Sequence, residues 1–205
     1  MKEKMYLYPV FIRIWHLINA LCFLVLIITG IAMQYSDPGS PFISFSASRN
    51  LHNICGIILT FNYLLFFIGN WISGNGRQYR IQWKGLRKRL IQQARFYIRG
   101  YFKREEPPFP VLEDRKFNPL QGLTYAMALY IGVPFLIITG WGLLFPEAIL
   151  DRIFGVSGLM VADILHVIAG FLLSIFMIIH IYLCTLGKNP ADNFRSIMSG
   201  WHQAH

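Results

Sequence analysis

Four long apolar stretches dominate the sequence and restrict the folds open to it. They cover about residues 15–35, 51–72, 122–145 and 160–186, and each approaches or exceeds the ~20 apolar residues that a helix needs to cross a bilayer. Only 14% of the 205 residues are charged and 55% are hydrophobic, whereas about a quarter of a soluble domain is charged. The sequence therefore predicts an all-α integral membrane protein, a four-helix bundle forming a single membrane domain over residues 1–205.

The net charge of +9 is concentrated in the loop over residues 77–104. Its basic residues, with no acid between them, are Arg77, Arg80, Lys84, Arg87, Lys88, Arg89, Arg95, Arg99, Lys103 and Arg104. Between two spans, such a block indicates a cytoplasmic loop by the positive-inside rule, and no nucleic-acid partner is expected. Four spans then place both termini in the cytoplasm, with a bacterial inner (cytoplasmic) membrane as the natural setting. The first stretch is too long for a signal peptide, so an uncleaved anchor is expected.

Within this loop, apolar residues recur every three or four positions between the cations. They are Leu86, Leu90, Ala94, Tyr97, Ile98 and Tyr101. The pattern predicts a cytoplasmic-side amphipathic helix between spans two and three, lying on an anionic leaflet. A docking surface for a cytoplasmic protein is the alternative.

The fourth apolar stretch carries two histidines, His166 and His180. They are 14 residues apart, which is almost four helical turns, so both point to nearly the same face at depths ~21 Å apart. Imidazole inside a membrane is costly and usually has a function. Two further histidines, His16 and His52, begin the first and second stretches.

The predicted topology sorts the four histidines into two depth-matched pairs. His16 and His180 lie toward the cytoplasm, whereas His52 and His166 lie toward the outside. Two bis-histidine haems require such pairs, and the absence of a C-x-x-C-H motif indicates non-covalent haem b. Zinc and copper also bind imidazole, but no carboxylate or thiolate completes their coordination. A hydrogen-bonded helix contact is the remaining alternative.

Arginines and glycines lie where a haem would need them. Arg13 precedes His16 by three residues and Arg49 precedes His52 by three, so each could pair with haem propionates, or else simply extend toward the interface. Three glycines are expected to leave room for the macrocycles, at Gly30, Gly56 and Gly170. Close helix–helix packing is the competing explanation for them.

Two short motifs occur twice. The motif Leu-Ile-Ile-Thr-Gly covers residues 26–30 and 136–140, and Leu-His-x-x-x-Gly covers residues 51–56 and 165–170. A duplicated helical hairpin explains both repeats, although chance similarity between apolar helices remains possible. Outside these motifs, we expect Cys22, Cys55 and Cys184 to be small buried hydrophobic residues, and His202 and His205 to be solvated.

At its four histidines, the chain resembles the di-haem cytochrome b subunits of nickel–iron hydrogenases, respiratory formate dehydrogenases and thiosulfate reductases. The resemblance implies two haem b groups, an extracytoplasmic redox subunit (an iron–sulfur protein or a multihaem cytochrome c) and a quinone, menaquinone or ubiquinone. Residues Lys116-Phe117-Asn118-x-x-Gln121 also resemble the stretch lining the menaquinone site of the formate dehydrogenase subunit, although Leu120 replaces a glycine there. Asn118 and Gln121 are therefore expected to contact quinone; the alternative is that Asn118 caps the helix while Gln121 faces the headgroups.

The implied function is electron transfer across the membrane through two haems, between the extracytoplasmic subunit and the quinone pool. Two alternatives from other classes stay open on the sequence alone. One is a membrane anchor for a redox complex without its own essential role in electron transfer. The other is a small histidine-lined transporter.

Overall fold

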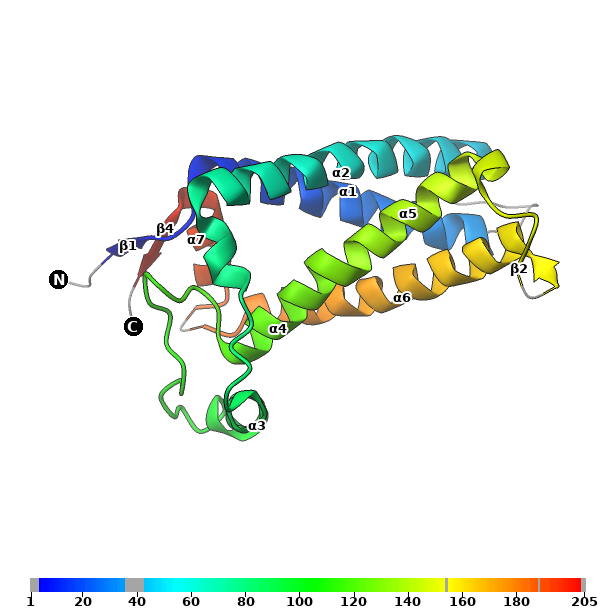
Figure 1. Cartoon of the computed structure of the whole chain (residues 1–205). Coiled ribbons are helices and arrows are strands. Elements are labelled where there is room, and N and C mark those ends of the chain that lie inside the picture. Colours follow the sequence, from blue (N-terminus) through cyan, green and yellow to red (C-terminus); the bar gives the residue numbers. More distant parts are fainter. Residues whose placement is uncertain (1–3, 36–42, 154, 188, 204–205) are drawn as a thin grey trace. The chain divides into compact units, whose positions relative to one another are not determined.

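A computed structural model of the chain describes residues 4–35, 43–153, 155–187 and 189–203. Four helical segments in it are long and apolar enough to cross a membrane (Figure 1). They are α1 (Val10–Tyr35), α2 (Phe45–Ser73), the continuous run Pro119–Leu144, and α6 (Gly158–Cys184). All four predicted spans are confirmed as helices. The tail residue His205 lies outside the described residues.

The third segment consists of three consecutive helices, namely α4 (Pro119–Met127), η3 (Ala128–Gly132) and α5 (Val133–Leu144). The middle piece is a π-helical turn directly before Pro134. A proline inside a helix lacks an N–H and its ring clashes with the carbonyl four residues earlier. The wider turn removes that conflict and lets the helix continue.

The all-α expectation did not include four short strands. Strand β1 (Lys4–Tyr6) pairs antiparallel with β4 (Trp201–Gln203), and β2 (Arg152–Ile153) pairs with β3 (Val156–Ser157). Strands of two or three residues carry no periodic pattern that a sequence could reveal. The remaining short elements are η1 (Asn75–Tyr79), α3 (Leu86–Arg95), η2 (Phe96–Gly100), η4 (Pro146–Ala148) and α7 (Asp192–Ser199).

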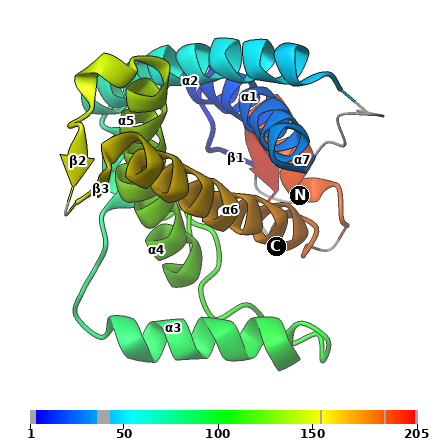
Figure 2. The ribbon, with the colours of Figure 1, turned by 90° about the vertical axis from the view of Figure 1, so that its right-hand side faces the viewer.

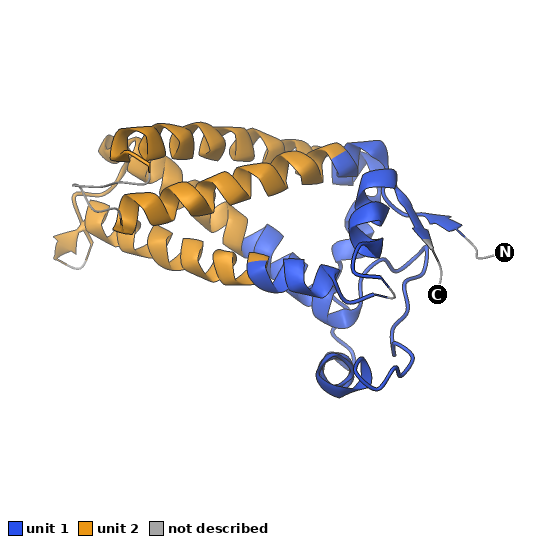
Figure 3. Cartoon of the chain, turned by 180° about the vertical axis from the view of Figure 1, so that it is seen from behind, with its two compact units in different colours: residues 1–13, 69–131, 178–205 blue, residues 14–68, 132–177 orange. Residues whose placement is uncertain are grey.

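The chain divides into two compact units (Figure 3). Unit 1 consists of Met1–Arg13, Gly69–Ile131 and Ile178–His205, and unit 2 of Ile14–Ile68 and Gly132–Met177. Unit 2 is a bundle of parts of α1, α2, α5 and α6. In its core the Trp15 ring stacks on Phe66 with centroids 4.2 Å apart, while many long apolar side chains stay exposed. Such an outer surface suits lipid rather than water.

In unit 1 the two ends of the chain are tied together. Beyond the β1–β4 pair, the main-chain N–H groups of Leu7 and Tyr8 donate to the carbonyl of Gly200 at 2.9 and 3.2 Å. Gly200 has φ of 88°, and a Cβ there would come within 2.8 Å of the Tyr8 carbonyl oxygen, so the position requires glycine. The prediction that His202 is solvated is wrong: it is buried, and its Nδ1 lies 3.2 Å from Ser196 Oγ.

The predicted amphipathic helix is present as α3 continued by η2. This helix runs crosswise to α4. Figure 1 shows α3 end-on while α4 runs across the view, and Figure 2 shows α3 from the side. The predicted apolar stripe, with Leu86, Leu90 and Tyr97, is half-buried in the protein. Ile98, predicted in the same stripe, is instead exposed, and it forms an exposed apolar set with Trp83, Ile91 and Phe102.

Candidate cofactor site

Two of the predicted histidines face each other inside unit 2. His52 lies on α2 and His166 on α6, their ring centroids are 6.2 Å apart, and their ring planes are inclined at 67°. Two imidazoles that ligate one metal from opposite sides have centroids about 6 Å apart, because a metal–nitrogen bond is about 2 Å and the ring centre lies about 1 Å beyond. The pair therefore has the separation of two axial ligands.

Each of these imidazoles is held by a threonine hydroxyl. Thr29 Oγ1 lies 3.0 Å from His52 Nδ1, and Thr139 Oγ1 lies 2.8 Å from His166 Nδ1. Both hydroxyls also donate to the main-chain carbonyl four residues earlier, Val25 at 2.6 Å and Phe135 at 2.8 Å. Because its proton is used there, the hydroxyl accepts from the Nδ1–H of the histidine. Nε2 then carries the lone pair needed for metal ligation.

The glycine after each threonine brings the helix close to the ligand ring. A Cβ at Gly30 would lie 3.6 Å from Cε1 of His52, and one at Gly140 would lie 3.2 Å from Cε1 of His166. The repeated Leu-Ile-Ile-Thr-Gly motif therefore serves one purpose twice, which is to approach and orient a histidine. Gly30 was predicted to leave room for a macrocycle. Thr29, Thr139 and Gly140 were not proposed as site residues, although the repeat was the signal that could have identified them.

The other two predicted glycines lie one helical turn after the histidines. A Cβ at Gly56 or Gly170 would meet no other atom within 4 Å. Neither glycine is therefore explained by close helix–helix packing within the described structure. Their contact with a macrocycle remains a prediction.

The donor set fits haem better than a bare metal ion. Among the residues that the structure describes, no three histidine, cysteine, aspartate or glutamate side chains come together as a metal site. Zinc sites in proteins take at least three protein ligands. A haem iron, whose other four ligands are porphyrin nitrogens, needs only the two imidazoles that unit 2 supplies.

His16 and His180 belong to different units, so each is described in its own surroundings. His16 is half-buried in unit 2 beside Trp15. In unit 1, the Nδ1 of His180 lies 3.2 Å from the hydroxyl oxygen of Tyr125, and the two ring centroids are 5.5 Å apart. A hydroxyl again faces Nδ1, as at His52 and His166. The pairing of His16 with His180 remains a prediction.

Comparison with protein families decides the class of the chain. The model of the prokaryotic cytochrome b561 family matches residues 7–200. The chain belongs to this family. The resemblance expected from the four histidines is thereby confirmed, the protein is a prokaryotic membrane cytochrome, and the family implies haem b.

Two known proteins are similar to this chain over most of its length. The putative cytochrome YdhU of Escherichia coli (strain K12) is 35% identical over 201 residues, which cover 98% of this chain and 76% of the relative. The probable Ni/Fe-hydrogenase B-type cytochrome subunit of Rhodobacter capsulatus is 27% identical over 201 residues, covering 88% of this chain and 74% of the relative.

The predicted propionate ligands of the cytochrome differ in their surroundings. The Arg13 guanidinium is half-buried and donates through Nη2 to the main-chain carbonyl of Met198 at the end of α7. Arg49 is exposed, one turn before His52. Propionate binding by either arginine remains a prediction, and for Arg13 the structure adds a contact within the protein.

The predicted quinone residues form a complete capping box at the start of α4. Asn118 Oδ1 accepts from the N–H groups of Leu120 and Gln121 at 3.1 and 3.0 Å, and Gln121 Oε1 accepts from the Asn118 N–H at 3.2 Å. Asn118 Nδ2 donates to the hydroxyl oxygen of Tyr97 at 2.7 Å. Burial raises the pKa of Tyr97. The capping role that was the alternative for Asn118 is therefore present and extends to Gln121, while their contact with quinone remains a prediction.

Proposed function

We propose that this cytochrome is a di-haem subunit that carries electrons across the bacterial inner membrane between an extracytoplasmic redox partner and the quinone pool. The His52–His166 pair, 6.2 Å between ring centroids, carries the proposal. Its two threonine contacts support ligation through Nε2 on both sides. The second haem is assigned to His16 and His180.

A bound haem would supply one-electron redox chemistry. The chain itself contributes position and environment. His52 and His166 would hold the haem iron through two imidazoles, and a haem held in this way would have no open iron position for oxygen. The threonines orient the imidazoles and raise their basicity, while the apolar helices exclude water.

The orientation follows from charge. The basic loop over residues 77–104 is assigned to the cytoplasm by the positive-inside rule. An even number of spans then returns the second terminus to the same side as the first, and the pairing of β1 with β4 within unit 1 supports this. Reporter fusions after Gln78 and after Ala204 should therefore read cytoplasmic, and one after Gly39 should read periplasmic. Labelling of the loop from outside intact cells would reverse the assignment.

The partner is proposed from a relative. One similar protein is the probable Ni/Fe-hydrogenase B-type cytochrome subunit of Rhodobacter capsulatus. By analogy, the partner of this cytochrome is an extracytoplasmic subunit with an iron–sulfur or multihaem cytochrome c centre. Menaquinone or ubiquinone is expected to exchange electrons near the start of α4, where Asn118 and Gln121 lie.

Haem content tests the proposal. The purified protein should hold two b-type haems that acid acetone extracts. Replacing His52 or His166 by alanine should remove one haem and leave the spectrum of the other, while replacing His16 or His180 should do the reverse. A wild-type ratio near one haem per chain, or loss of both haems in all four variants, would contradict the two-pair assignment.

The same variants address the alternative role of a membrane anchor. Within the assembled complex, the single-haem variants should still bind the partner but lose electron flow to quinone. Unchanged electron flow in all four would mean that the chain acts as an anchor.

A further inference from the structure

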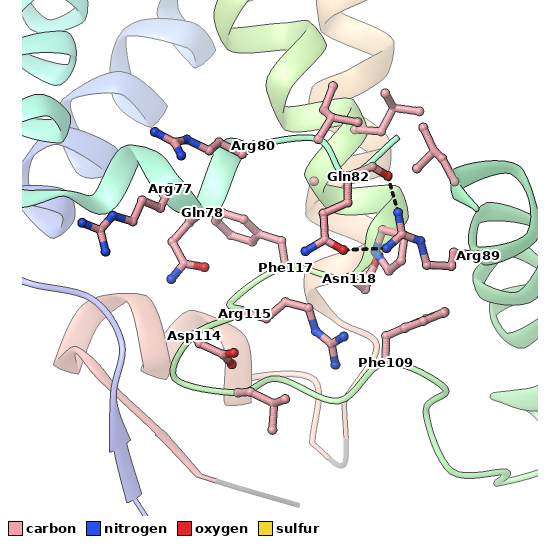
Figure 4. Close-up of a pocket in the computed structure, with 16 residues that line it drawn as sticks. Arg77, Gln78, Arg80, Gln82, Arg89, Phe109, Asp114, Arg115, Phe117 and Asn118 are labelled. Atoms are coloured by element: carbon pink, nitrogen blue, oxygen red, sulfur yellow. Dashed lines mark hydrogen bonds between the residues drawn. The ribbon is translucent and has the colours of Figure 1, made fainter. Parts of the chain in front are cut away.

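A basic pocket of about 210 Å³ lies in unit 1, away from the four histidines in sequence. It is lined by residues of η1, α3, the following loop and the start of α4 (Figure 4). Its lining contains four arginines, Arg77, Arg80, Arg89 and Arg115, against one acid, Asp114. The pocket is therefore positively charged.

Two of these arginines are fixed by contacts with the protein. Arg89 Nη1 donates to Gln82 Oε1 at 2.7 Å, and its Nη2 donates to the main-chain carbonyl of Gln82. Arg115 Nη2 donates to the carbonyl of Pro110 at 3.3 Å, and its guanidinium carbon lies 5.8 Å from the centroid of the Phe109 ring. Figure 4 shows the Arg89 guanidinium directed at Gln82 and the Arg115 guanidinium on the side of Phe109, both among the side chains that line the pocket. The pocket is thus preorganised.

Both arginines keep unused donor capacity. The Nε atoms of Arg89 and Arg115 are buried without a hydrogen-bond partner among the described residues. A buried donor of a charged group without a partner is costly, so both guanidinium groups keep donor capacity that the described residues do not satisfy.

A neutral ligand suits the pocket less well. The amide of Asn118, which also lines it, is already engaged by Tyr97 and by the start of α4. The charged groups of the lining are four arginines against one aspartate, so their net charge is positive. Guanidinium groups match the oxygens of phosphate through paired N–H donors, so the pocket favours a phosphate group.

The surroundings of the pocket identify the source of that phosphate. The exposed apolar set defined above, Trp83, Ile91, Ile98 and Phe102, lies on the same segment of unit 1 and is between 58% and 73% exposed. Exposed apolar side chains on the helical segment that also carries Arg89 suit the acyl chains of a lipid. We propose that this pocket binds the phosphate of an anionic phospholipid headgroup, with Arg89 and Arg115 as its main contacts.

Charge-matched variants of the full-length protein test the proposal. The double variant Arg89→Gln/Arg115→Gln removes two cations from the pocket, while Arg87→Gln/Lys88→Gln removes two from exposed positions of α3 outside the lining. Binding is measured with vesicles of phosphatidylcholine with and without phosphatidylglycerol. The pocket variant should lose roughly tenfold or more in affinity for phosphatidylglycerol vesicles, because hydrogen bonds to charged groups are strong. The control variant should change it by about twofold or less.

Three outcomes would overturn the proposal. Equal losses in both double variants would mean general attraction between the basic loop and an anionic surface. Equal binding of the wild-type protein to vesicles with and without phosphatidylglycerol would exclude an anionic lipid. Inorganic phosphate that binds the pocket as tightly as phosphatidylglycerol would make it a site for free phosphate.

A second pair of variants covers a possible failure to fold. Arg89→Lys and Arg115→Lys keep the charge but lose the paired donors. Each should bind phosphatidylglycerol several-fold more weakly than wild type while keeping the haem spectrum. Wild-type affinity in both lysine variants would show that charge alone matters, which contradicts a built phosphate site.

Discussion

The hydroxyl oxygen of Thr139 lies 2.8 Å from Nδ1 of His166 and donates its own proton to the carbonyl of Phe135. Thr29 stands in the same relation to His52. The proton count decides the direction of both contacts, since a hydroxyl that has already donated can only accept. Each imidazole is thereby fixed in the tautomer that ligates a metal through Nε2.

Removing these hydroxyls should change the haem without removing it. In Thr29→Val and Thr139→Val, the Nδ1–H loses its acceptor, so the imidazole becomes less basic and stabilises ferric iron less. We expect the midpoint potential of the haem at His52 and His166 to rise by tens of millivolts, with altered electron paramagnetic resonance g values. Potentiometric titration of the purified protein measures this.

Two kinds of control variant distinguish a threonine that orients the imidazole from one that only packs between helices. Serine at position 29 or 139 keeps a hydroxyl and should restore most of the wild-type potential. Thr124→Val removes a hydroxyl bonded to Leu120 in α4 and should leave this haem unchanged. If the valine variants keep the wild-type potential and g values, the threonines serve helix packing only.

Gly56 and Gly170 allow a separate test of where the macrocycle lies. A methyl group at either position meets no other atom within 4 Å in the described protein, so alanine there should not disturb helix packing. If the haem lies against these glycines, Gly56→Ala and Gly170→Ala should lower haem occupancy at the His52–His166 site several-fold. The haem-to-protein ratio measures this.

Gly122 in α4 provides the matched control. Its Cβ would also meet no atom within 4 Å, and it is not adjacent to a histidine in sequence. Gly122→Ala should bind both haems normally. Full haem content in Gly56→Ala and Gly170→Ala would mean that the macrocycle does not contact these glycines.

The spans and the histidine pair in unit 2 were predictable because they depend on long or repeated patterns. An apolar run of about 20 residues has few alternatives to a spanning helix, and depth along such a helix follows from its rise per residue. His52 and His166 could therefore be paired before any coordinates were available.

The contacts that complete the site could not be predicted in the same way. Whether a threonine in an apolar helix faces a histidine depends on how neighbouring helices rotate, and sequence spacing within one helix does not fix that rotation. For Asn118 and Gln121 the sequence allows two roles, because the same two amides fit both a helix cap and a quinone site. The burial of His202 depends on strands too short to leave a pattern.

Lys116 should give the stability of unit 1 a dependence on pH. Its Nζ donates to Asn75 Oδ1 at 2.8 Å, and partial burial lowers its pKa below 10.5. The unfolded chain therefore binds the lysine proton more tightly, so stability is lowest below the folded pKa and rises with pH toward 10.5. The thermal midpoint of the wild type should rise relative to Lys116→Gln across that window.

The difference in thermal midpoint between the wild type and Lys116→Gln reports on the lysine alone, because the buried tyrosines titrate in both proteins. Lys84→Gln, at an exposed position of the same loop, is the charge-matched control and should track the wild type. A constant difference between wild type and Lys116→Gln at every pH would show that Lys116 binds its proton equally in both states.

The amides at the start of α4 can be tested for quinone contact without breaking the cap. Aspartate is as good an N-cap as asparagine, and glutamate completes a capping box as glutamine does. Asn118→Asp and Gln121→Glu therefore keep the helix start while replacing an amide donor with a carboxylate. Leucine at either position removes the cap as well, at a cost of about 1 kcal/mol.

If Asn118 and Gln121 donate to quinone carbonyls, both conservative variants should keep the two haem spectra but slow haem reoxidation by a menaquinone analogue several-fold. Gln92→Glu, which places the same new charge at an exposed position of α3, should reoxidise at the wild-type rate. Stopped-flow absorbance of the reduced haems measures these rates. Should the conservative variants match the wild type while the leucine variants only lose stability, the two amides serve the helix cap alone and quinone exchanges electrons elsewhere.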